Sequence, residues 1–366
     1  MMGSRACRAN LIQYLTIMSS NLVQRVADTD DETLPAQTPD DDVWSLLRAT
    51  SRTFALSIEG LPAGLRDEVA VSYLLFRVSD YLEDHDELPR AVKVELLRLW
   101  DATLADPSGI DEFLRRLDEL PRRPDDPEAA AAARAGMLLE ATRAFSPAAV
   151  EAITMRVGET TRGMARRQEM GPFIENEYEL DRYMHDVAGL VGYLVTDLFA
   201  LRFRSVAPLR SKLMPLAREF GLALQTVNVL RGLRKDYERG WVFVPRTLCE
   251  RYGLSYAEFF CPSNRRSAMR VVGALIEKAE RHLEAGLAYV RTLPRHLHRV
   301  RLACMWPLLF AAGTLGVSRG NPEVLTGEVK IGRDAVKRIV RRTTLYGWSN
   351  AWLGGYTVRL LANPEE

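Results

Sequence analysis

Residues 73–84 read YLLFRVSDYLED and combine an apolar run with evenly spaced charges. Apolar residues recur at three- and four-residue spacing, which predicts a helix with one buried face. Residues four apart on a helix lie one above the other, so Asp80 and Asp84 direct two carboxylates to one point. Arg77 and Tyr73 continue the same stripe one turn earlier.

This pattern predicts a diphosphate clamp built around a metal ion. Magnesium binds hard oxygen ligands and typically uses one or two carboxylates together with substrate phosphates. Taken alone, Asp80 and Asp84 also fit a solvent-facing acidic patch that includes Glu83 and Asp86. The apolar residues at 74–76 favour the clamp, because a carboxylate on a buried helix needs a partner.

A second segment upstream, Ser51-Arg52-Thr53-Phe54, places a hydroxyl next to a guanidinium. Both groups recognise phosphate through charge-assisted hydrogen bonds. We therefore take Ser51, Arg52, Phe54 and Arg77 as candidate substrate-binding residues. The alternative is a helix cap followed by a surface arginine.

A third segment, residues 225–236 (QTVNVLRGLRKD), predicts another phosphate- or metal-facing helix. Gln225, Asn228 and Asp236 can share one face of it. The candidates are Asn228 and Asp236 for metal and Gln225, Asn228, Arg231 and Lys235 for substrate. By itself the segment also fits an ordinary amphipathic helix.

Residues 183–192 (YMHDVAGLVG) place small residues inside a helical pattern. Glycine in a helix costs about 1 kcal/mol relative to alanine, so it usually has a packing or ligand-access reason. Here both a cavity border and close helix packing remain open. His185 is expected to be a hydrogen-bonded structural residue rather than a metal ligand.

The composition is that of a globular protein, with 366 residues, 47% hydrophobic and 27% charged. A formal net charge of +1 gives no field that favours nucleic acid, and none is expected as a partner. The arginines of 162–167 and 338–342 are expected on solvated or phosphate-facing helix surfaces. The four cysteines form no C-x-x-C pair, which favours free thiols and a cytoplasmic location.

The chain divides into a polar, acidic leader over residues 1–42 and one domain over 43–366. From Val43 onward helical periodicity is nearly continuous and is punctuated by prolines, which predicts about ten or more helices. Only Trp241–Pro245 fits a short extended piece. The longest apolar stretch, 302–317, is short and contains Pro307, so any membrane contact should be peripheral. These features predict an all-α bundle around a central cavity.

Taken together and in this order, the segments resemble the squalene/phytoene synthase family, and squalene synthase most of all. The resemblance runs from about Trp44 to about Lys337. Its C-terminal part includes Cys304-Met305-Trp306-Pro307 and Gly327-Glu328-Val329-Lys330-Ile331, which are similar to squalene synthase segments rather than phytoene synthase ones.

The resemblance implies an isoprenoid synthase fold and a magnesium-dependent prenyltransferase, monomeric, acting on isoprenoid diphosphates. It implies that two farnesyl diphosphates join head to head through a cyclopropylcarbinyl diphosphate, which NADPH then reduces to squalene. Lys330 and Arg333 lie in the region that corresponds to the NADPH site. Tyr73, Asp80 and Asp84 correspond to catalytic positions.

Three residues depart from the family pattern: Gly232 and Lys235 stand where carboxylates are usual, and Asp186 stands where a proton-handling tyrosine is usual. The second helix thereby loses two negative charges and gains one positive charge. Asp186 is a candidate catalytic residue, either as a displaced metal ligand or as a base. The alternative function is a prenyltransferase or cyclase that uses one allylic diphosphate with a different acceptor. A non-enzymatic lipid or diphosphate binder is a third reading, against which the complete first clamp argues.

Overall fold

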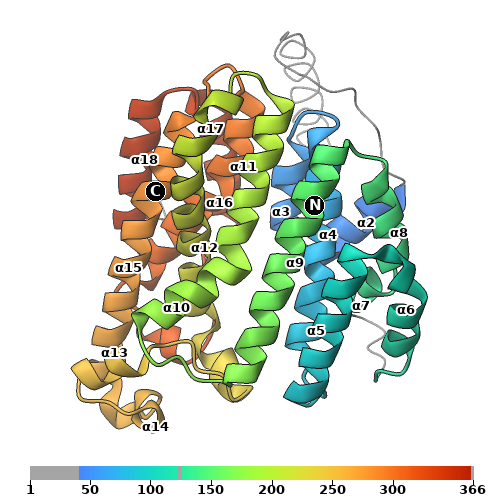
Figure 1. Ribbon diagram of the computed structural model, residues 1–366. Coiled ribbons are helices and arrows are strands. Elements are labelled where there is room, and N and C mark those ends of the chain that lie inside the picture. Colours follow the sequence, from blue (N-terminus) through green and yellow to red (C-terminus); the bar gives the residue numbers. More distant parts are fainter. Residues whose placement is uncertain (1–40, 122–125, 364–366) are drawn as a thin grey trace, which may run out of the picture.

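The computed structural model describes residues 41–121 and 126–363, and helices make up nearly all of this part (Figure 1). The α-helices are α2 (Asp41–Thr50), α3 (Arg52–Glu59), α4 (Leu65–Asp84), α5 (Arg90–Ala105), α6 (Ile110–Asp118), α7 (Pro127–Ala132), α8 (Ala135–Arg143), α9 (Pro147–Met170), α10 (Glu177–Met184), α11 (Leu190–Arg202), α12 (Arg210–Glu238), α13 (Arg246–Arg251), α14 (Tyr256–Phe259), α15 (Arg265–Thr292), α16 (His298–Ser318), α17 (Arg333–Tyr346) and α18 (Asn350–Ala362). Short 3₁₀ helices are η1 (Pro107–Gly109), η3 (Ala207–Leu209), η4 (Pro262–Asn264) and η5 (Pro322–Leu325).

One π-helix, η2 (His185–Gly189), joins α10 to α11. A π-turn inserts a residue into the helical ladder and often marks a functional site. The predicted extended piece is confirmed at Val242, which forms an isolated parallel bridge with Phe173. The all-α prediction is also confirmed for the part of the chain that the structure describes.

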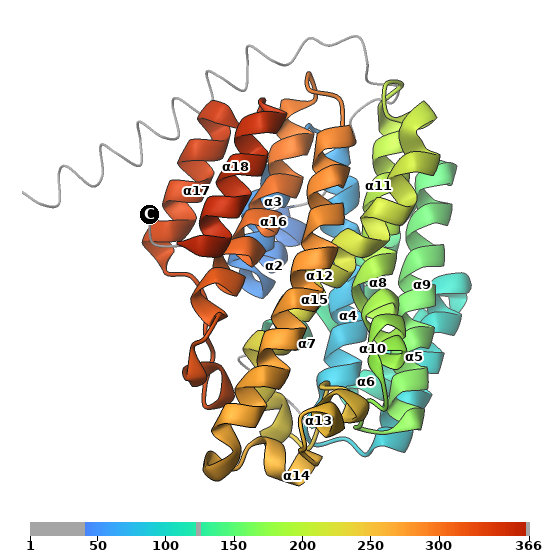
Figure 2. The same ribbon diagram turned by 90° about the vertical axis from the view of Figure 1, so that its left-hand side faces the viewer.

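The helices form a single bundle whose long members run side by side (Figures 1 and 2). On one side α4, α5 and α9 pack together, and on the other α12 packs along α15 while α16 contacts α3, α17 and α18. The connection α10–η2–α11 lies between the two groups and contacts both α9 and α12. The α4 and α12 segments of the predicted site therefore belong to opposite sides of the bundle.

Helix α4 is buried for most of its length, as the apolar pattern predicts. Leu74, Leu75, Val78 and Leu82 are completely excluded from solvent. At roughly 25 cal/mol per Å² of apolar area removed from water, such side chains supply the main stabilisation of the bundle. Their burial also holds the polar stripe of α4 in a defined orientation.

Glycines of α11 and α12 allow the η2–α11 segment to come into close backbone contact with α12. A Cβ on Gly192 would lie 2.3 Å from the carbonyl oxygen of Ala217, and one on Gly221 would lie 2.4 Å from that of Ala188. Of the two explanations left open for the small residues, close helix packing is therefore confirmed. His185 differs from expectation, because its Nδ1 has no hydrogen-bond partner and its ring instead packs against Tyr193.

Two helical stretches reach the length and apolar character of a membrane span, Glu177–Arg202 and His298–Ser318. The second is continuous through Pro307, contrary to the expected interruption. Of its apolar window, 72% is buried inside the bundle, against 44% for the first. They are weak indications of a span, because core helices of a globular protein meet the same criterion.

Two other expectations are tested only in part. The leader predicted over 1–42 falls almost wholly outside the described residues, and α2 already begins at Asp41. Cys249, Cys261 and Cys304 are free thiols, as predicted, while Cys7 lies in the part that is not described.

Replacing Gly192 with alanine should destabilise the protein by about 1–3 kcal/mol, because the new methyl group overpacks the contact with α12. The matched control is Gly355→Ala in α18, where a Cβ meets nothing within 4 Å. That change should be neutral or stabilise by about 0.5–1 kcal/mol, as alanine is the better helix former. Urea unfolding followed by circular dichroism measures both. Equal stability of the two variants would contradict the packing explanation.

Candidate active site

On the α4 side, Arg77 is the centre of a polar cluster. Its Nε donates to the hydroxyl of Tyr73 over 2.8 Å, and its Nη1 lies 2.8 Å from Asp80 and 3.1 Å from Glu128. Asp80 and Arg77 are about three quarters buried. Because the guanidinium is shared between two carboxylates, it fixes the direction of Asp80.

The Ser51–Phe54 segment joins this cluster. The Ser51 hydroxyl accepts from the backbone N–H of Phe54, so it caps α3, and it lies near enough to Tyr73 to oppose the rise that burial causes in the pKa of that residue. The ring of Phe54 packs 5.8 Å from that of Tyr73. Ser51 is therefore both the N-cap of α3 and a candidate site residue. The side chain of Arg52 lies outside what the structure describes.

Glu128 was not among the predicted residues. It lies in the first turn of α7, 51 positions after Arg77 in the chain. Its segment reads as a proline-rich break with charged residues, and no helical spacing connects it to α4. Only tertiary contact between α4 and α7 brings it to the site.

At its other end the site is closed by Arg239, which follows α12. Arg239 forms ion pairs with Asp84 at 2.9 Å and with Asp86 at 3.0 Å. Asp84 is the last residue of α4, and its side chain is 61% exposed, so it lies at the rim rather than fully inward. Arg239 thus links the predicted clamp on α4 to the end of α12.

The carboxylates on α4 and on α12 influence one another electrostatically. Burial raises the pKa of Asp236 to about 6, and the charge of Asp84 adds to this while Arg239 and Lys235 oppose it. Burial raises the pKa of Glu83 to about 8, with Asp84 and Asp80 adding. It also raises the pKa of Asp80. Burial is the largest cause of each shift and neighbouring carboxylates add to it, so a cation that entered the cluster would favour the ionised carboxylates.

Such a cluster suits a divalent cation. Within the described ranges, no three His, Cys, Asp or Glu residues converge closely enough to hold a metal alone. Magnesium does not require this, because one or two carboxylates plus water and phosphate oxygens complete its octahedron. The Asp80–Asp84 pair fits that arrangement once the ion pair between Arg239 and Asp84 opens.

The polar residues of α12 have the spacing that the sequence predicts, but few of them are acidic. Asn228 is exposed and donates to Gln225 over 3.2 Å, and Lys235 is exposed one turn before the end of the helix. A Cβ on Gly232 would lie 2.7 Å from a carboxylate oxygen of Asp236, so glycine leaves room for that carboxylate to lie along the helix.

Arg231 connects α12 to the C-terminal segment. It pairs with Glu328 at 2.5 Å, and Glu328 in turn pairs with Lys330. Lys330 is therefore held beside α12, whereas Arg333 is exposed at the start of α17. The structure brings the first of these two predicted cofactor residues near the site.

Tyr183 is another residue that the sequence did not single out. It is the penultimate residue of α10, and its ring stacks on Phe243 at 4.9 Å, which stacks on Trp241. Burial raises the pKa of Tyr183 well above its ordinary value, and the carboxylates of Glu83, Asp84, Asp236 and Asp80 add to the shift. An aromatic wall therefore stands directly beside the acidic cluster.

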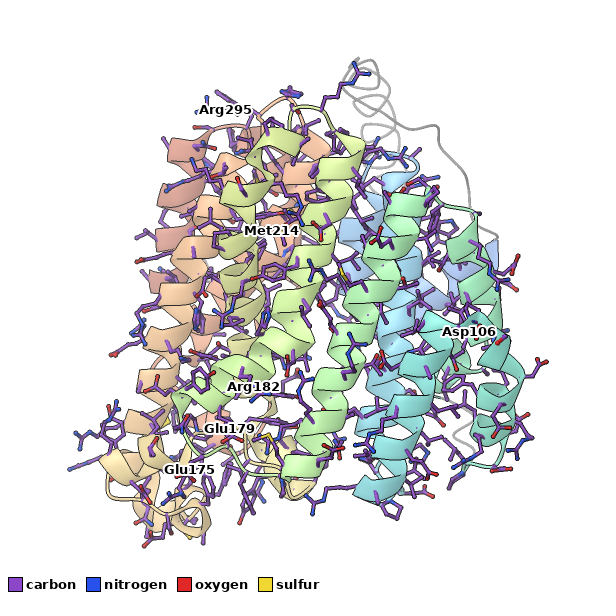
Figure 3. All side chains as sticks on the ribbon, viewed as in Figure 1. Asp106, Glu175, Glu179, Arg182, Met214 and Arg295 are labelled. Carbon is purple, nitrogen blue, oxygen red and sulfur yellow. The ribbon has the colours of Figure 1, made fainter. Side chains whose placement is uncertain are left out.

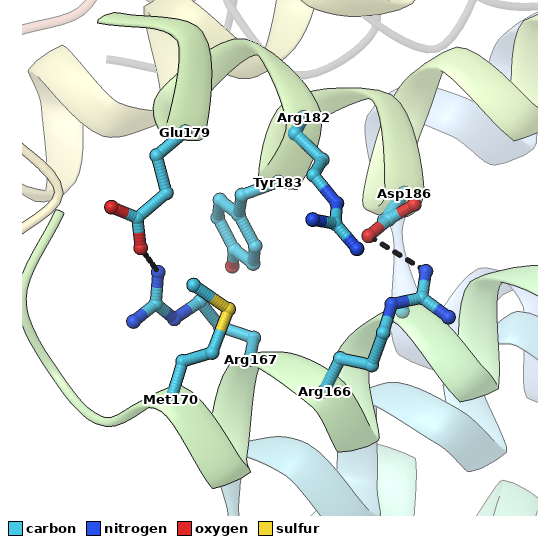
Figure 4. A pocket seen from close by; sticks show the side chains of 8 residues that line it. Arg166, Arg167, Met170, Glu179, Arg182, Tyr183 and Asp186 are labelled. Carbon is cyan, nitrogen blue, oxygen red and sulfur yellow. Dashed lines mark hydrogen bonds and ion pairs between the residues drawn. The ribbon is translucent and has the colours of Figure 1, made fainter. Parts of the chain in front are cut away.

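Asp186 lies apart, in a pocket between α9 and the α10–η2 segment (Figure 4). It is largely buried against Gly163 and pairs with Arg166 at 3.0 Å. The principal lining side chains are Arg166, Arg167, Met170, Glu179, Arg182 and Tyr183. The structure thus brings Asp186 to Arg166 and assigns it no contact with the carboxylates of α4 or α12.

Comparison with known proteins agrees with this arrangement of helices. A model of the family described as squalene/phytoene synthase matches residues 47–334. The chain belongs to the squalene/phytoene synthase family. Members of this family are prenyltransferases, and the matched range lies within the resemblance read from the sequence.

Several squalene synthases are similar to the chain. Squalene synthase of Nicotiana benthamiana is 30% identical over 308 residues, which are 82% of this chain and 69% of that protein. Botryococcus squalene synthase of Botryococcus braunii is 28% identical over 81% of this chain, but the match takes in only 61% of that protein's length.

Among solved structures, a complex of TcSQS with the ligand BPH1237 superposes with a TM-score of 0.75 at 26% identity, covering 88% of this chain and 92% of that one. Squalene synthase HpnC from Alicyclobacillus acidocaldarius superposes with a TM-score of 0.52 at 18% identity, covering 74% of this chain and 91% of that one. The latter likeness concerns the fold alone.

The pKa of Glu128 leads to a test of the acidic cluster. Burial and the charges of Asp80 and Asp84 raise it from 4.5 to about 7, against the opposing effect of Arg77. A carboxyl whose folded pKa is raised stabilises the fold below its unfolded pKa, and this stability is lost as pH rises through the folded value. In EDTA, wild-type protein should therefore lose thermal stability relative to Glu128→Gln as pH rises from 4.5 to 7.

The measurement is the midpoint of thermal unfolding across that pH range. Glutamine keeps an oxygen that accepts from Arg77 but carries no charge. Glu140→Gln, on the exposed surface of α8, is the control and should follow wild type at every pH. A constant difference between Glu128→Gln and wild type would show that the pKa of Glu128 is not raised in the folded protein.

Proposed function

We propose that this protein is a magnesium-dependent prenyltransferase that joins two farnesyl diphosphates head to head. The observation that supports it most is the ion pair at 2.9 Å between Asp84 of α4 and Arg239 at the end of α12, which brings the Asp80–Asp84 pair to the helix that carries Asp236. Family membership supports the reaction class. A C30 product and its reduction are the finer parts of the proposal.

Each part of the site has a task in this reaction. Asp80 and Asp84, with Asn228 and Asp236 opposite, would hold magnesium, which neutralises the charge that develops on a departing diphosphate. Arg77 orients Asp80 and keeps one N–H edge near the phosphate position. Phe54 and Tyr73 on one side and Tyr183 on the other exclude water from the allylic cation.

The proposed reaction begins with ionisation of one substrate molecule. The C1–O bond of the first farnesyl diphosphate breaks, and its electron pair leaves with diphosphate. The C2–C3 double bond of the second molecule attacks that C1, and loss of one proton closes a cyclopropane ring that still bears diphosphate. With NADPH, departure of this second diphosphate, rearrangement and hydride transfer would give squalene.

The cofactor part of the proposal relies on Lys330 and Arg333. Lys330 is tied through Glu328 to Arg231 on α12, so its ammonium can reach a phosphate near this helix. Arg333 forms no ion pair within the part of the chain that the structure describes. We further propose a cytoplasmic monomer whose contact with membranes is peripheral, since both substrate tails and product are water-insoluble.

A second candidate function follows from the poverty of acid on α12. Gly232 and Lys235 leave Asp236 as the one carboxylate in this stretch of the helix, which weakens a second metal site. A single allylic diphosphate would then ionise at Asp80 and Asp84, and its cation would alkylate a different acceptor or cyclise. The same clamp serves both reactions, so only products separate them.

Asp80→Asn and Asp84→Asn should each lower kcat by two orders of magnitude or more, which is about 2.7 kcal/mol of barrier. The neutral amide cannot supply the charge that magnesium requires. Asp118→Asn, on the exposed end of α6, is the control and should keep full activity. Far-ultraviolet circular dichroism checks that each variant is folded. Unchanged turnover in folded Asp80→Asn protein would refute the clamp.

Product analysis with farnesyl diphosphate and magnesium, with and without NADPH, tests the reaction itself. A cyclopropyl C30 diphosphate without NADPH and squalene with it are expected. A C15 alcohol or cyclic hydrocarbon from one substrate molecule would favour the second candidate. Folded protein that releases no diphosphate from farnesyl or geranylgeranyl diphosphate would overturn both.

A further inference from the structure

The pocket between α9 and α10 carries more positive than negative charge. Three guanidiniums line it, from Arg166, Arg167 and Arg182, against the two carboxylates of Glu179 and Asp186. Arg166 pairs with Asp186 and Arg167 with Glu179, as Figure 4 shows. Within the described residues Arg182 has no recorded ion pair, so one full positive charge in the pocket is uncompensated.

Two of the arginines also present unused donors. The Nε atoms of Arg166 and Arg167 are buried and have no hydrogen-bond partner. A buried donor left unsatisfied costs about 1–3 kcal/mol, so its persistence calls for an explanation. An acceptor that enters the pocket supplies one.

The lining is built rather than accidental. Gly163 is required beneath Asp186, because a Cβ there would lie 2.9 Å from its carboxylate oxygen. Arg167 is held by Glu179 and by the backbone oxygens of Gly171 and Phe173, and it is only 4% exposed. Glu179 and Arg182 lie one turn apart on α10, above Glu175 at the lower end of the bundle (Figure 3).

Tyr183 belongs both to the pocket and to the electrostatic surroundings of the acidic site. This residue lines the pocket and also interacts electrostatically with Asp84 and Asp236. Arg167 likewise lowers the pKa of Glu83, which opposes the effect of its burial. Charge in the pocket and charge in the acidic site therefore influence the same two residues, Tyr183 and Glu83.

We propose that this pocket binds a diphosphate or other phosphate group without a metal ion, through Arg166 and Arg182. The planar guanidinium matches two phosphate oxygens at once, and Arg166 can keep Asp186 on one nitrogen while donating from others. The pocket would replace, with arginines on α9 and α10, the charge neutralisation that α12 lost at Gly232 and Lys235.

A role of this pocket in catalysis rests on the proposed function, but its binding of phosphate does not. The ligand can be the diphosphate of a second prenyl substrate, released inorganic diphosphate, or the phosphates of NADPH. All three share the chemistry that the arginines recognise. The three sources differ in whether the remainder of the molecule strengthens binding.

The test is calorimetric titration of the full chain with inorganic diphosphate in EDTA. Wild-type protein should bind, and Arg182→Gln should bind at least about tenfold more weakly, as expected for loss of a charged hydrogen bond. Arg182 is exposed and unpaired, so this change should not affect folding. Arg166→Gln should weaken binding similarly, and Arg182→Lys should weaken it less because it keeps the charge.

The matched control is Arg162→Gln, on the same helix but paired with Asp101 outside the pocket. It should bind diphosphate as wild type does. Asp80→Asn should also bind normally in EDTA, which separates this pocket from the clamp. Displacement by NADPH or by a non-hydrolysable farnesyl diphosphate analogue identifies the source that binds most tightly.

Absence of metal-free binding, or equal affinity of wild type, Arg166→Gln and Arg182→Gln, would overturn the proposal. Binding that requires magnesium and is lost in Asp80→Asn alone would assign the anion to the clamp instead. In either case turnover of farnesyl diphosphate by wild-type protein would still stand. Conversely, metal-free binding with no prenyl product would retain the pocket and remove the proposed reaction.

Discussion

Neutralising buried acid is the constraint around which this site is organised. Asp80 and Glu83 on α4, Glu128 on α7 and Asp236 on α12 all have raised pKa values, and burial is the largest cause in each case. Arg77 and Arg239 offset part of this charge from within the chain. In the proposed function, a magnesium ion that arrives with a diphosphate would offset the rest. The cost of keeping these carboxylates together without a ligand is a reason for binding one.

The bundle makes that arrangement durable. Leu74, Leu75, Val78 and Leu82 of α4 are completely buried, so the helix cannot rotate its polar stripe toward solvent without exposing them. Close contact of Gly192 and Gly221 with backbone oxygens sets α11 and η2 against α12. The distance between the two acidic sides is thus determined by packing, not by the acids themselves.

Under our proposal, guanidinium groups take over part of the charge neutralisation in the second half of the site. Helix α12 carries Gly232 and Lys235 where the sequence resemblance implies carboxylates, while α9 and α10 present arginines to a pocket that Tyr183 lines. Asp186 belongs to that pocket, through Arg166, and not to the carboxylates of α4 and α12. In such a site, a metal ion held by carboxylates would bind one diphosphate and guanidinium groups would bind the other.

The local pattern of residues was sufficient for the helices, the polar stripe Tyr73–Arg77–Asp80 and the shared face of Asn228 and Asp236, because i to i+4 spacing depends only on helix geometry. It could not reveal Glu128, Tyr183 or Arg239. Glu128 reaches Arg77 across 51 positions of chain, and Arg239 reaches Asp84 across 155. Nor could spacing decide whether Asp186 faces a metal or an arginine. Contacts of that kind arise only when packing brings separate helices together, and no period within one segment encodes them.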